Sequence, residues 1–342
     1  AKAEAKAAKA AAKAEAKAAK LAAKGDDWVD LPPPPPAVPL VQGAMPYDFN
    51  GDGSTDLLWC NRRTKAVAIW LMNGMAPSSV IDLGTLEKNW KFVGSGDFDG
   101  VGYADLLLQW GRNVYDIWFM ENGQLRNAVR LEGPPSGYRF EALGDFDGDG
   151  YVDLLWRKGK SSLVWFMRGW TVDEAVAGPL IRKLSPAACT PDLDADGRSD
   201  LVWSGGKETV SWLMAGASPW RSGPAGPGMK KSQAIGCGDT DGDGFDDVLW
   251  FHKKLGGIVW VMDGNLAVDL SLELPALEAG WVMEASGDFN GMGNANEVLV
   301  RDTKTGAIEV WQLQWNSAGT SFSVASTPGP GMGSKDWEVV AP

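Results

Sequence analysis

Carboxylates at positions 1, 3, 5 and 9 of a nine-residue segment are the side chains of this chain best suited to bind a metal ion. The clearest copy runs from Asp145 to Asp153, with the sequence Asp-Phe-Asp-Gly-Asp-Gly-Tyr-Val-Asp. Calcium takes about six to eight oxygen ligands in a flexible shell, so carboxylates spaced in this way can converge on one ion. The apolar run that follows, Leu154-Leu155-Trp156, is typical of a strand and not of the second helix of an EF-hand.

Related segments occur six times along the chain. They are called loops 1 to 6 and comprise residues 48–56, 97–105, 145–153, 192–200, 239–247 and 288–296. Loops 1, 3, 4 and 5 keep a side-chain oxygen at positions 1, 3, 5 and 9, and position 7 adds a backbone carbonyl. The predicted metal ligands are Asp48, Asn50, Asp52, Ser54 and Asp56; Asp145, Asp147, Asp149, Tyr151 and Asp153; Asp192, Asp194, Asp196, Arg198 and Asp200; and Asp239, Asp241, Asp243, Phe245 and Asp247. We expect about four structural Ca²⁺ sites; the alternative is that these aspartates only cap their own backbone in turns.

Loops 2 and 6 are predicted to have lost the metal. Val101 and Met292 take position 5 in these two loops, and Asn296 takes position 9 of loop 6. The same two repeats replace the tryptophan of Asp-Leu-Leu-Trp with Leu108 and Leu299. We interpret the metal loop and the strand tryptophan as one packing unit, because the two features are lost together.

The loops recur at intervals of 49, 48, 47, 47 and 49 residues, which is the range of propeller blades. Each interval contains four short apolar stretches separated by turn residues, which is typical of a four-stranded blade. The fold class is therefore predicted to be all-β: a β-propeller over residues 41–342, with six blades favoured and seven as the alternative. Residues 337–342 match the strand that normally precedes a loop, so we expect this C-terminal strand to close the first blade.

The loop, the following Asp-Leu-Leu-Trp and a later strand such as Trp70-Leu71-Met72 together resemble the FG-GAP/VCBS repeat family over about residues 40–342. The resemblance implies a calcium-binding β-propeller of the kind found in bacterial surface and secreted proteins, integrin heads and some fungal lectins. It also implies an extracellular, cell-surface or periplasmic location. The family hosts several functions, so the resemblance does not fix one.

The first 40 residues have a different composition. Residues 1–24 are rich in alanine and carry seven lysines on one stripe of a predicted helix. This helix is either a spacer or a segment that docks on a partner or an anionic surface. Residues 25–40 contain five consecutive prolines and are predicted to form a stiff linker, or a ligand for a proline-binding partner.

Charge and cysteine content limit the partners. The chain has a net charge of −12; residues 1–24 contribute +5, which leaves −17 for the remainder. This argues against nucleic acid as a partner of the propeller. No run of eighteen apolar residues predicts a transmembrane segment. Cys60, Cys189 and Cys237 lack metal-type spacing, and we expect them to be buried free thiols.

Catalysis has little support in the sequence, so the chain is not expected to be an enzyme. His252 is the only histidine and is expected to be a turn residue, and neither Gly-x-Ser-x-Gly nor His-Glu-x-x-His occurs. A carbohydrate lyase or hydrolase whose acidic residues meet only in space is the less favoured alternative.

The tryptophans fall into two groups. Six tryptophans, one in each repeat, occupy the same position of the pattern and are expected in the core: Trp70, Trp118, Trp165, Trp212, Trp260 and Trp311. Four lie outside the repeat pattern and are candidates for an exposed binding surface: Trp110, Trp170, Trp220 and Trp315.

Together these patterns predict a secreted or cell-surface, calcium-stabilised propeller that acts as a non-catalytic binding module for a carbohydrate or an adhesion ligand. The expected partner is a glycan or a protein. The alternative is a structural or interaction subunit of a larger assembly, docked through the N-terminal helix and the proline-rich segment.

Overall fold

The computed structural model describes residues 46–181, 185–186, 189–205, 207–331 and 334–340. The predicted helix at 1–24, the linker at 25–40 and the domain boundary at residue 41 lie outside the described residues. All regular structure within the described residues is β-strand.

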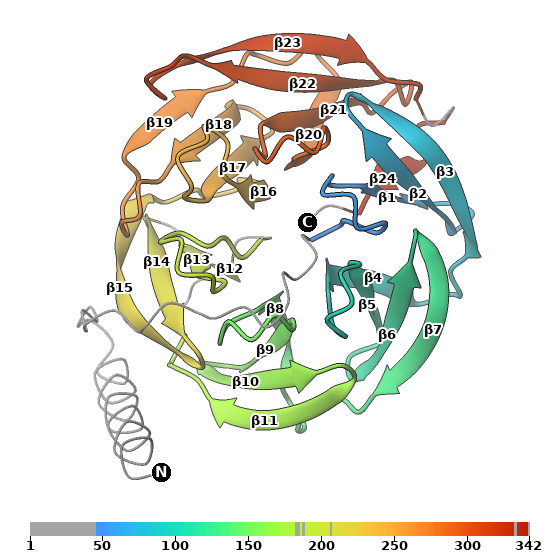
Figure 1. Cartoon of the computed structure of the whole chain (residues 1–342), viewed down its shortest axis with the longest axis vertical. Coiled ribbons are helices and arrows are strands. Elements are labelled where there is room, and N and C mark those ends of the chain that lie inside the picture. Colours follow the sequence, from blue (N-terminus) through green and yellow to red (C-terminus); the bar gives the residue numbers. More distant parts are fainter. Residues whose placement is uncertain (1–45, 182–184, 187–188, 206, 332–333, 341–342) are drawn as a thin grey trace.

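Six four-stranded antiparallel sheets are arranged as blades around a central axis (Figure 1). Blade 1 contains loop 1, blade 2 contains loop 2, and so on around the ring. From the axis outward, blade 1 consists of β24 (Trp337–Val339), β1 (Leu57–Asn61), β2 (Ala66–Asn73) and β3 (Ala76–Thr85); blade 2 of β4 (Trp90–Gly96), β5 (Asp105–Trp110), β6 (Val114–Glu121) and β7 (Gln124–Leu131); and blade 3 of β8 (Arg139–Gly144), β9 (Asp153–Lys158), β10 (Ser161–Arg168) and β11 (Thr171–Ala177). Blade 4 consists of β12 (Ser185–Pro186), β13 (Leu201–Ser204), β14 (Glu208–Ala215) and β15 (Ser218–Pro227); blade 5 of β16 (Gln233–Gly238), β17 (Asp247–His252), β18 (Gly256–Val261) and β19 (Leu270–Glu273); and blade 6 of β20 (Trp281–Gly287), β21 (Glu297–Asp302), β22 (Ile308–Trp315) and β23 (Phe322–Pro328). The prediction of six blades is confirmed, and the alternative of seven is wrong.

The C-terminal strand closes the ring, as predicted. β24 pairs antiparallel with β1, with Trp59 opposite Val339 and Asn61 opposite Trp337. The backbone N–H of Val340 donates to the carbonyl of Leu58 at 2.8 Å. The first and last segments of the propeller therefore share one sheet, and neither end of the ring is left as an open edge.

Burial of both sheet faces explains why the second strand of each blade is a continuous apolar run. In β9 every residue from Asp153 to Arg157 is buried, because neighbouring blades cover both faces of the sheet. The outermost strand has no such cover, and the first five residues of β11 are exposed.

Five of the six repeated tryptophans are buried, which confirms their assignment to the core: Trp70, Trp165, Trp212, Trp260 and Trp311. In four blades the repeated tryptophan also pairs with a tryptophan of the second strand. Trp59, Trp156, Trp203 and Trp250 are at most 1% exposed. Each packs against the tryptophan of the third strand, with ring centroids 5.0–5.4 Å apart. Leu108 and Leu299 occupy the equivalent buried positions in blades 2 and 6. Trp118, in blade 2, is only partly buried and packs against the apolar core shared by blades 1 and 2.

The expectation of three free thiols is wrong. Cys189 and Cys237 form a disulfide with their Cα atoms 5.9 Å apart, and only Cys60 is a free cysteine. The two bonded cysteines are 48 residues apart, about one repeat, so the propeller brings nearly equivalent positions of blades 4 and 5 together. The bond therefore joins two neighbouring blades covalently.

Removal of β24 should open the ring. A chain truncated after residue 336 loses the three ladder pairs to β1 and the packing of Trp337 and Val339 in the core shared by blades 1 and 6. We expect the melting temperature to fall by about 5–10 °C, since burial of this size contributes roughly 2–4 kcal/mol. Thermal unfolding followed by circular dichroism measures this. A chain lacking only residues 341–342 is the control, and equal melting of both truncated chains would contradict the closure.

Candidate metal centres

Each loop leads into the second strand of its blade, and the loops gather around the central axis (Figure 1). The carboxylate at position 1 shapes the loop by accepting backbone N–H groups. Asp145 accepts from Gly148 at 2.6 Å and from Gly150 at 2.8 Å. Both glycines have positive φ angles, +77° and +89°, which a residue with a side chain rarely adopts. The contact from position 6 to position 1 is present in all six loops.

The carboxylate at position 9 ties the loop to the third strand of the same blade. Asp153 is fully buried and accepts hydrogen bonds from the backbone N–H of Phe146 at 3.0 Å and of Met167 at 2.9 Å. The same pair of contacts is made in the other four loops that end in aspartate, by Asp56, Asp105, Asp200 and Asp247.

In four loops three carboxylate oxygens, one from each of three aspartates, lie within 4.8 Å of one another. These groups are Asp97, Asp99 and Asp105; Asp145, Asp147 and Asp153; Asp192, Asp194 and Asp200; and Asp239, Asp241 and Asp243. Oxygen donors converging in this way fit a hard divalent cation, and additional loop oxygens and water can complete the shell. The geometry therefore brings together ligands predicted in loops 3, 4 and 5.

In loop 1 an amide takes the place of the carboxylate at position 3. Asn50 donates its side-chain N–H to Asp52 Oδ2 at 2.8 Å and accepts the backbone N–H of Asp52 through Oδ1 at 3.2 Å. Its amide oxygen remains a suitable calcium ligand. At position 7 the buried Ser54 donates its backbone N–H to Asp52, and Tyr151, Arg198 and Phe245 do the same to position 5 of their loops. The ligands predicted in loop 1 and at position 7 stay predictions.

Loop 2 is more complete than predicted. Val101 removes only position 5, and the three remaining carboxylates still converge. The guanidinium of Arg126 forms an ion pair with Asp99 and supplies a positive charge beside the group. The intact aspartates at positions 1, 3 and 9 are the signal of this group in the sequence, and the loss of the metal from loop 2 stays a prediction.

The prediction that Asn296 replaces the last ligand of loop 6 is wrong. Glu297, one residue later, takes the place of the aspartate at position 9 and accepts the backbone N–H of Phe289 at 3.0 Å. The side-chain N–H groups of Asn290 and Gln312 also donate to Glu297. Loop 6 is thus closed by amide donors, where loops 2 to 5 present convergent carboxylate oxygens.

Loop 4 contains a cation of its own. The predicted role of Arg198 was a backbone carbonyl ligand, but its side chain is also part of the loop. Arg198 Nη1 lies 2.7 Å from Asp196 Oδ2, and both side chains are close to nine-tenths buried. Its Nε donates to the carbonyl of Asp147 in loop 3 at 3.3 Å. The guanidinium therefore neutralises one loop carboxylate and joins two loops.

Burial raises the pKa of several loop carboxylates well above the ordinary value. The pKa of Asp145 is raised to about 6, that of Asp56 and of Asp247 to about 7, and that of Asp105 to about 8. The main cause in each case is desolvation of the charged form, and neighbouring aspartates add repulsion. A bound cation would act in the opposite direction, so these groups favour either a proton or a metal ion.

Hydrogen bonds between consecutive loops form a closed ring. The backbone N–H at position 8 of each loop donates to the carbonyl at position 1 of the preceding loop. The six bonds are Ala104 to Asp48 (2.7 Å), Val152 to Asp97 (3.1 Å), Ser199 to Asp145 (2.7 Å), Asp246 to Asp192 (3.1 Å), Ala295 to Asp239 (2.7 Å) and Thr55 to Asp288 (2.6 Å). The loops are therefore contacts between blades as well as turns within them.

The remaining candidate residues have mixed outcomes. His252 is the last residue of β17 and not a turn residue, but it shapes the turn that follows: its Nδ1 accepts the backbone N–H of Leu255 at 3.0 Å. Trp110 and Trp170 are 45% and 54% exposed, as predicted. Trp220 and Trp315 are not exposed surface residues, because both are partly buried against apolar clusters.

Comparison with known structures agrees with the propeller architecture. A lectin from Agrocybe aegerita, described as recognising non-reducing terminal N-acetylglucosamine, is 17% identical and has a TM-score of 0.56, with 84% of this chain and 80% of the lectin covered. The Photorhabdus luminescens Tc holotoxin pore is 13% identical, with a TM-score of 0.44 and coverage of 87% and 16%. Kluyveromyces lactis Hsv2 is 11% identical, with a TM-score of 0.43 and coverage of 82% and 96%. At its identity, the likeness to the lectin concerns the fold.

No curated protein sequence matches the chain. In the part of the chain that the structure describes, no helix has the length and apolar character needed to cross a membrane. A family model described as an FG-GAP-like repeat matches residues 48–108, which span loop 1, blade 1 and the start of blade 2. This match, together with six blades that repeat the same loop, fits an FG-GAP repeat family.

Proposed function

We propose that this propeller is a calcium-stabilised, non-catalytic module that binds a glycan outside the cell. The observation that carries the glycan assignment is the exposure of Trp170 and Trp110, two tryptophans that the repeat does not need for its core. An exposed indole offers a flat apolar face on which a sugar ring can stack.

The position of Trp170 supports a binding role. It lies in the turn between β10 and β11, is 54% exposed, and holds its ring edge-to-face against Phe119 of blade 2 with centroids 6.0 Å apart. The contact fixes the orientation of the ring while leaving much of it open to solvent. The structurally similar lectin from Agrocybe aegerita, described as recognising non-reducing terminal N-acetylglucosamine, lends the glycan assignment further support.

Calcium is the proposed ion because of the donor set. The loops offer carboxylate, amide and backbone oxygens, without a histidine or cysteine among the predicted ligands. Hard cations prefer oxygen donors, and a loop whose oxygens can adjust suits calcium better than the strict octahedron of magnesium. We assign ions to loops 1, 3, 4 and 5 as structural clasps.

The Cys189–Cys237 disulfide supports an extracellular, cell-surface or periplasmic location, because disulfides persist mainly in oxidising compartments. The use of His252 and of the buried aspartates as backbone acceptors supports a non-catalytic role. The alternative of an interaction subunit docked through residues 1–40 depends on a segment outside the described residues and stays a prediction.

Removal of calcium should destabilise the protein. We expect a chelator to lower the melting temperature by at least about 10 °C, since even one site saturated about 100-fold above its dissociation constant contributes roughly 2.7 kcal/mol. Calcium should restore the transition and an equal concentration of magnesium should restore less of it. Differential scanning calorimetry measures the change, and an unchanged melt in chelator would contradict structural calcium.

The metal-free protein should lose stability as pH rises. Because the folded-state pKa of carboxylates such as Asp56 and Asp247 is raised to about 7, their ionisation opposes folding. This cost is absent below about pH 4, the ordinary carboxylate pKa, and is complete above about pH 8. In chelator the urea midpoint should be higher at pH 5 than at pH 8, and saturating calcium should reverse the order. A chelated protein that is more stable at pH 8 would contradict the argument.

Trp170→Ala should weaken glycan binding at least about tenfold, a loss of roughly 1.4 kcal/mol, while the melting temperature stays within about 2 °C. Trp170→Phe, which keeps an aromatic face, should retain most of the affinity. Binding to a glycan array followed by titration calorimetry measures both variants alongside Trp110→Ala. Unchanged glycan binding by both alanine variants would show that neither tryptophan belongs to the binding site.

A further inference from the structure

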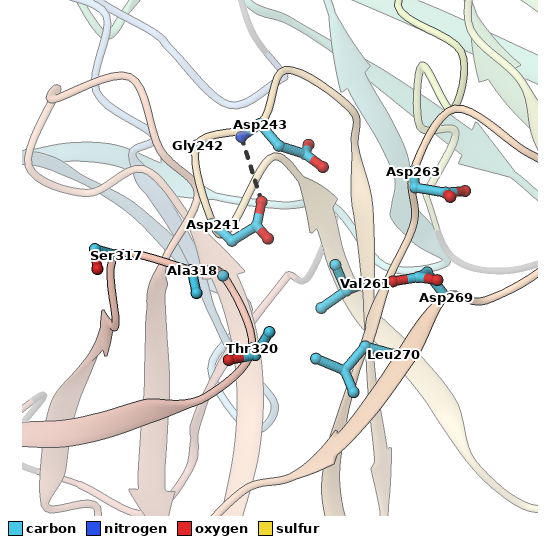
Figure 2. Close-up of a pocket in the computed structure, with 11 residues that line it drawn as sticks. Asp241, Gly242, Asp243, Val261, Asp263, Asp269, Leu270, Ser317, Ala318 and Thr320 are labelled. Carbon is cyan, nitrogen blue, oxygen red and sulfur yellow. Dashed lines mark hydrogen bonds between the residues drawn. The ribbon is translucent and has the colours of Figure 1, made fainter.

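An open cavity of about 430 Å³ lies between blades 5 and 6 (Figure 2). One side is formed by Asp241 and Asp243 of loop 5 and by Asp263, Asp269 and Leu270, which follow β18. The other side is the turn of residues 317–320 between β22 and β23. A cavity of this volume is within the range of small-molecule sites.

The cavity arises where the repeat departs from its pattern. In blades 1 to 4 two residues join the third and fourth strands, as in the turn of residues 169–170. In blade 5 the connection is residues 262–269, and in blade 6 it is residues 316–321. The longer turn of blade 6 comes directly against loop 5: a Cβ on Gly319 would lie 2.9 Å from Asp241 Oδ2. The cavity is therefore specific to this pair of blades.

The lining is acidic and rich in hydrogen-bond acceptors. Four aspartates and two hydroxyl residues surround an apolar floor, and none of the lining residues is lysine, arginine or histidine. An ion in loop 5 would neutralise part of the charge of Asp241 and Asp243. Asp263 and Asp269 lie outside the loop, so the cavity stays negative with or without calcium. A uronic acid, a sialic acid or a sulfated sugar would meet like charge there.

We infer that this cavity binds a glycan bearing free, protonated amino groups, such as an oligomer of glucosamine. The inference rests on the proposed glycan-binding function and names its substrate class. An ammonium group has three N–H donors for the carboxylates, and the hydroxyls of the same sugar supply further donors to the remaining acceptors. Val261 and Leu270 offer apolar surface to the C–H groups of the ring.

A lysine side chain of a partner peptide shares the ammonium chemistry but fits the lining less well. It brings three donors in total, whereas Asp263, Asp269 and the hydroxyls of Ser317 and Thr320, all outside loop 5, already offer more acceptors than three donors can use. The amino sugar is therefore the better complement, and the peptide becomes one outcome of the test.

The test compares two oligomers of equal length that differ only in acetylation, one of glucosamine and one of N-acetylglucosamine. Titration calorimetry at about pH 6 with calcium present should show the glucosamine oligomer binding at least about tenfold more tightly, with an affinity that falls as salt is raised. The double variant Asp263→Asn/Asp269→Asn, outside every loop, should lose this preference. Asp82→Asn, an exposed position on β3, is the matched control and should retain it.

Other results would overturn the inference in distinguishable ways. Equal affinity for the two oligomers, or a preference unchanged in the double variant, would refute the amino-sugar site and leave glycan binding elsewhere on the propeller intact. Tighter binding of a lysine-rich peptide, lost in the double variant, would replace the sugar with a polypeptide. Absence of binding to both oligomers would refute the site. Absence of binding to every sugar on a glycan array would also refute the proposed function.

Discussion

The fold depends on the hydrogen bond that position 8 of each loop donates to the first carbonyl of the preceding loop. Six such bonds make a closed ring near the axis, and the last of them joins Thr55 of loop 1 to Asp288 of loop 6. Close approach is needed for this contact. A Cβ on Gly144, which precedes loop 3, would lie 2.6 Å from Ser199 Cβ of loop 4, and a Cβ on Gly96 would lie 2.5 Å from Val152. Glycine before loops 2 and 3 thus meets a steric requirement of the ring, whereas Tyr47 and Pro191 precede loops 1 and 4.

Because the loops join neighbouring blades, whatever fixes a loop also fixes an interface. The position 9 carboxylate holds the loop to its own third strand, and the ring bond holds it to the next blade. Loop 6 reaches the same arrangement with different chemistry, since the amides of Asn290 and Gln312 donate to Glu297. These amide N–H groups stabilise the buried carboxylate of Glu297, as a bound cation would stabilise the carboxylates of another loop. Blade 6 therefore keeps its loop in place without the convergent carboxylates of loops 2 to 5.

Much of this architecture follows from the sequence because the period and the loop spacing are strong signals. The repeat predicted six blades and the closing strand, and apolar tryptophans such as Trp165 predicted the core. Glu297 does not fit the loop pattern, because it stands at position 10, one residue after the usual aspartate. Its longer side chain nevertheless accepts the backbone N–H that an aspartate at position 9 accepts in the other loops. The disulfide had a signal in its separation of 48 residues, about one repeat. The cavity between blades 5 and 6 depends on how two long turns meet, and residue types do not reveal that.

Structural cations are proposed in the loops of this ring, so the direct test is to count them. Native mass spectrometry of the full chain, equilibrated with calcium and then exchanged into a volatile buffer, should show about four bound ions, as expected for loops 1, 3, 4 and 5. Replacing Asp145 and Asp147 of loop 3 with asparagine should remove one ion and leave the others. A calcium-equilibrated chain with the mass of the metal-free polypeptide would contradict the account.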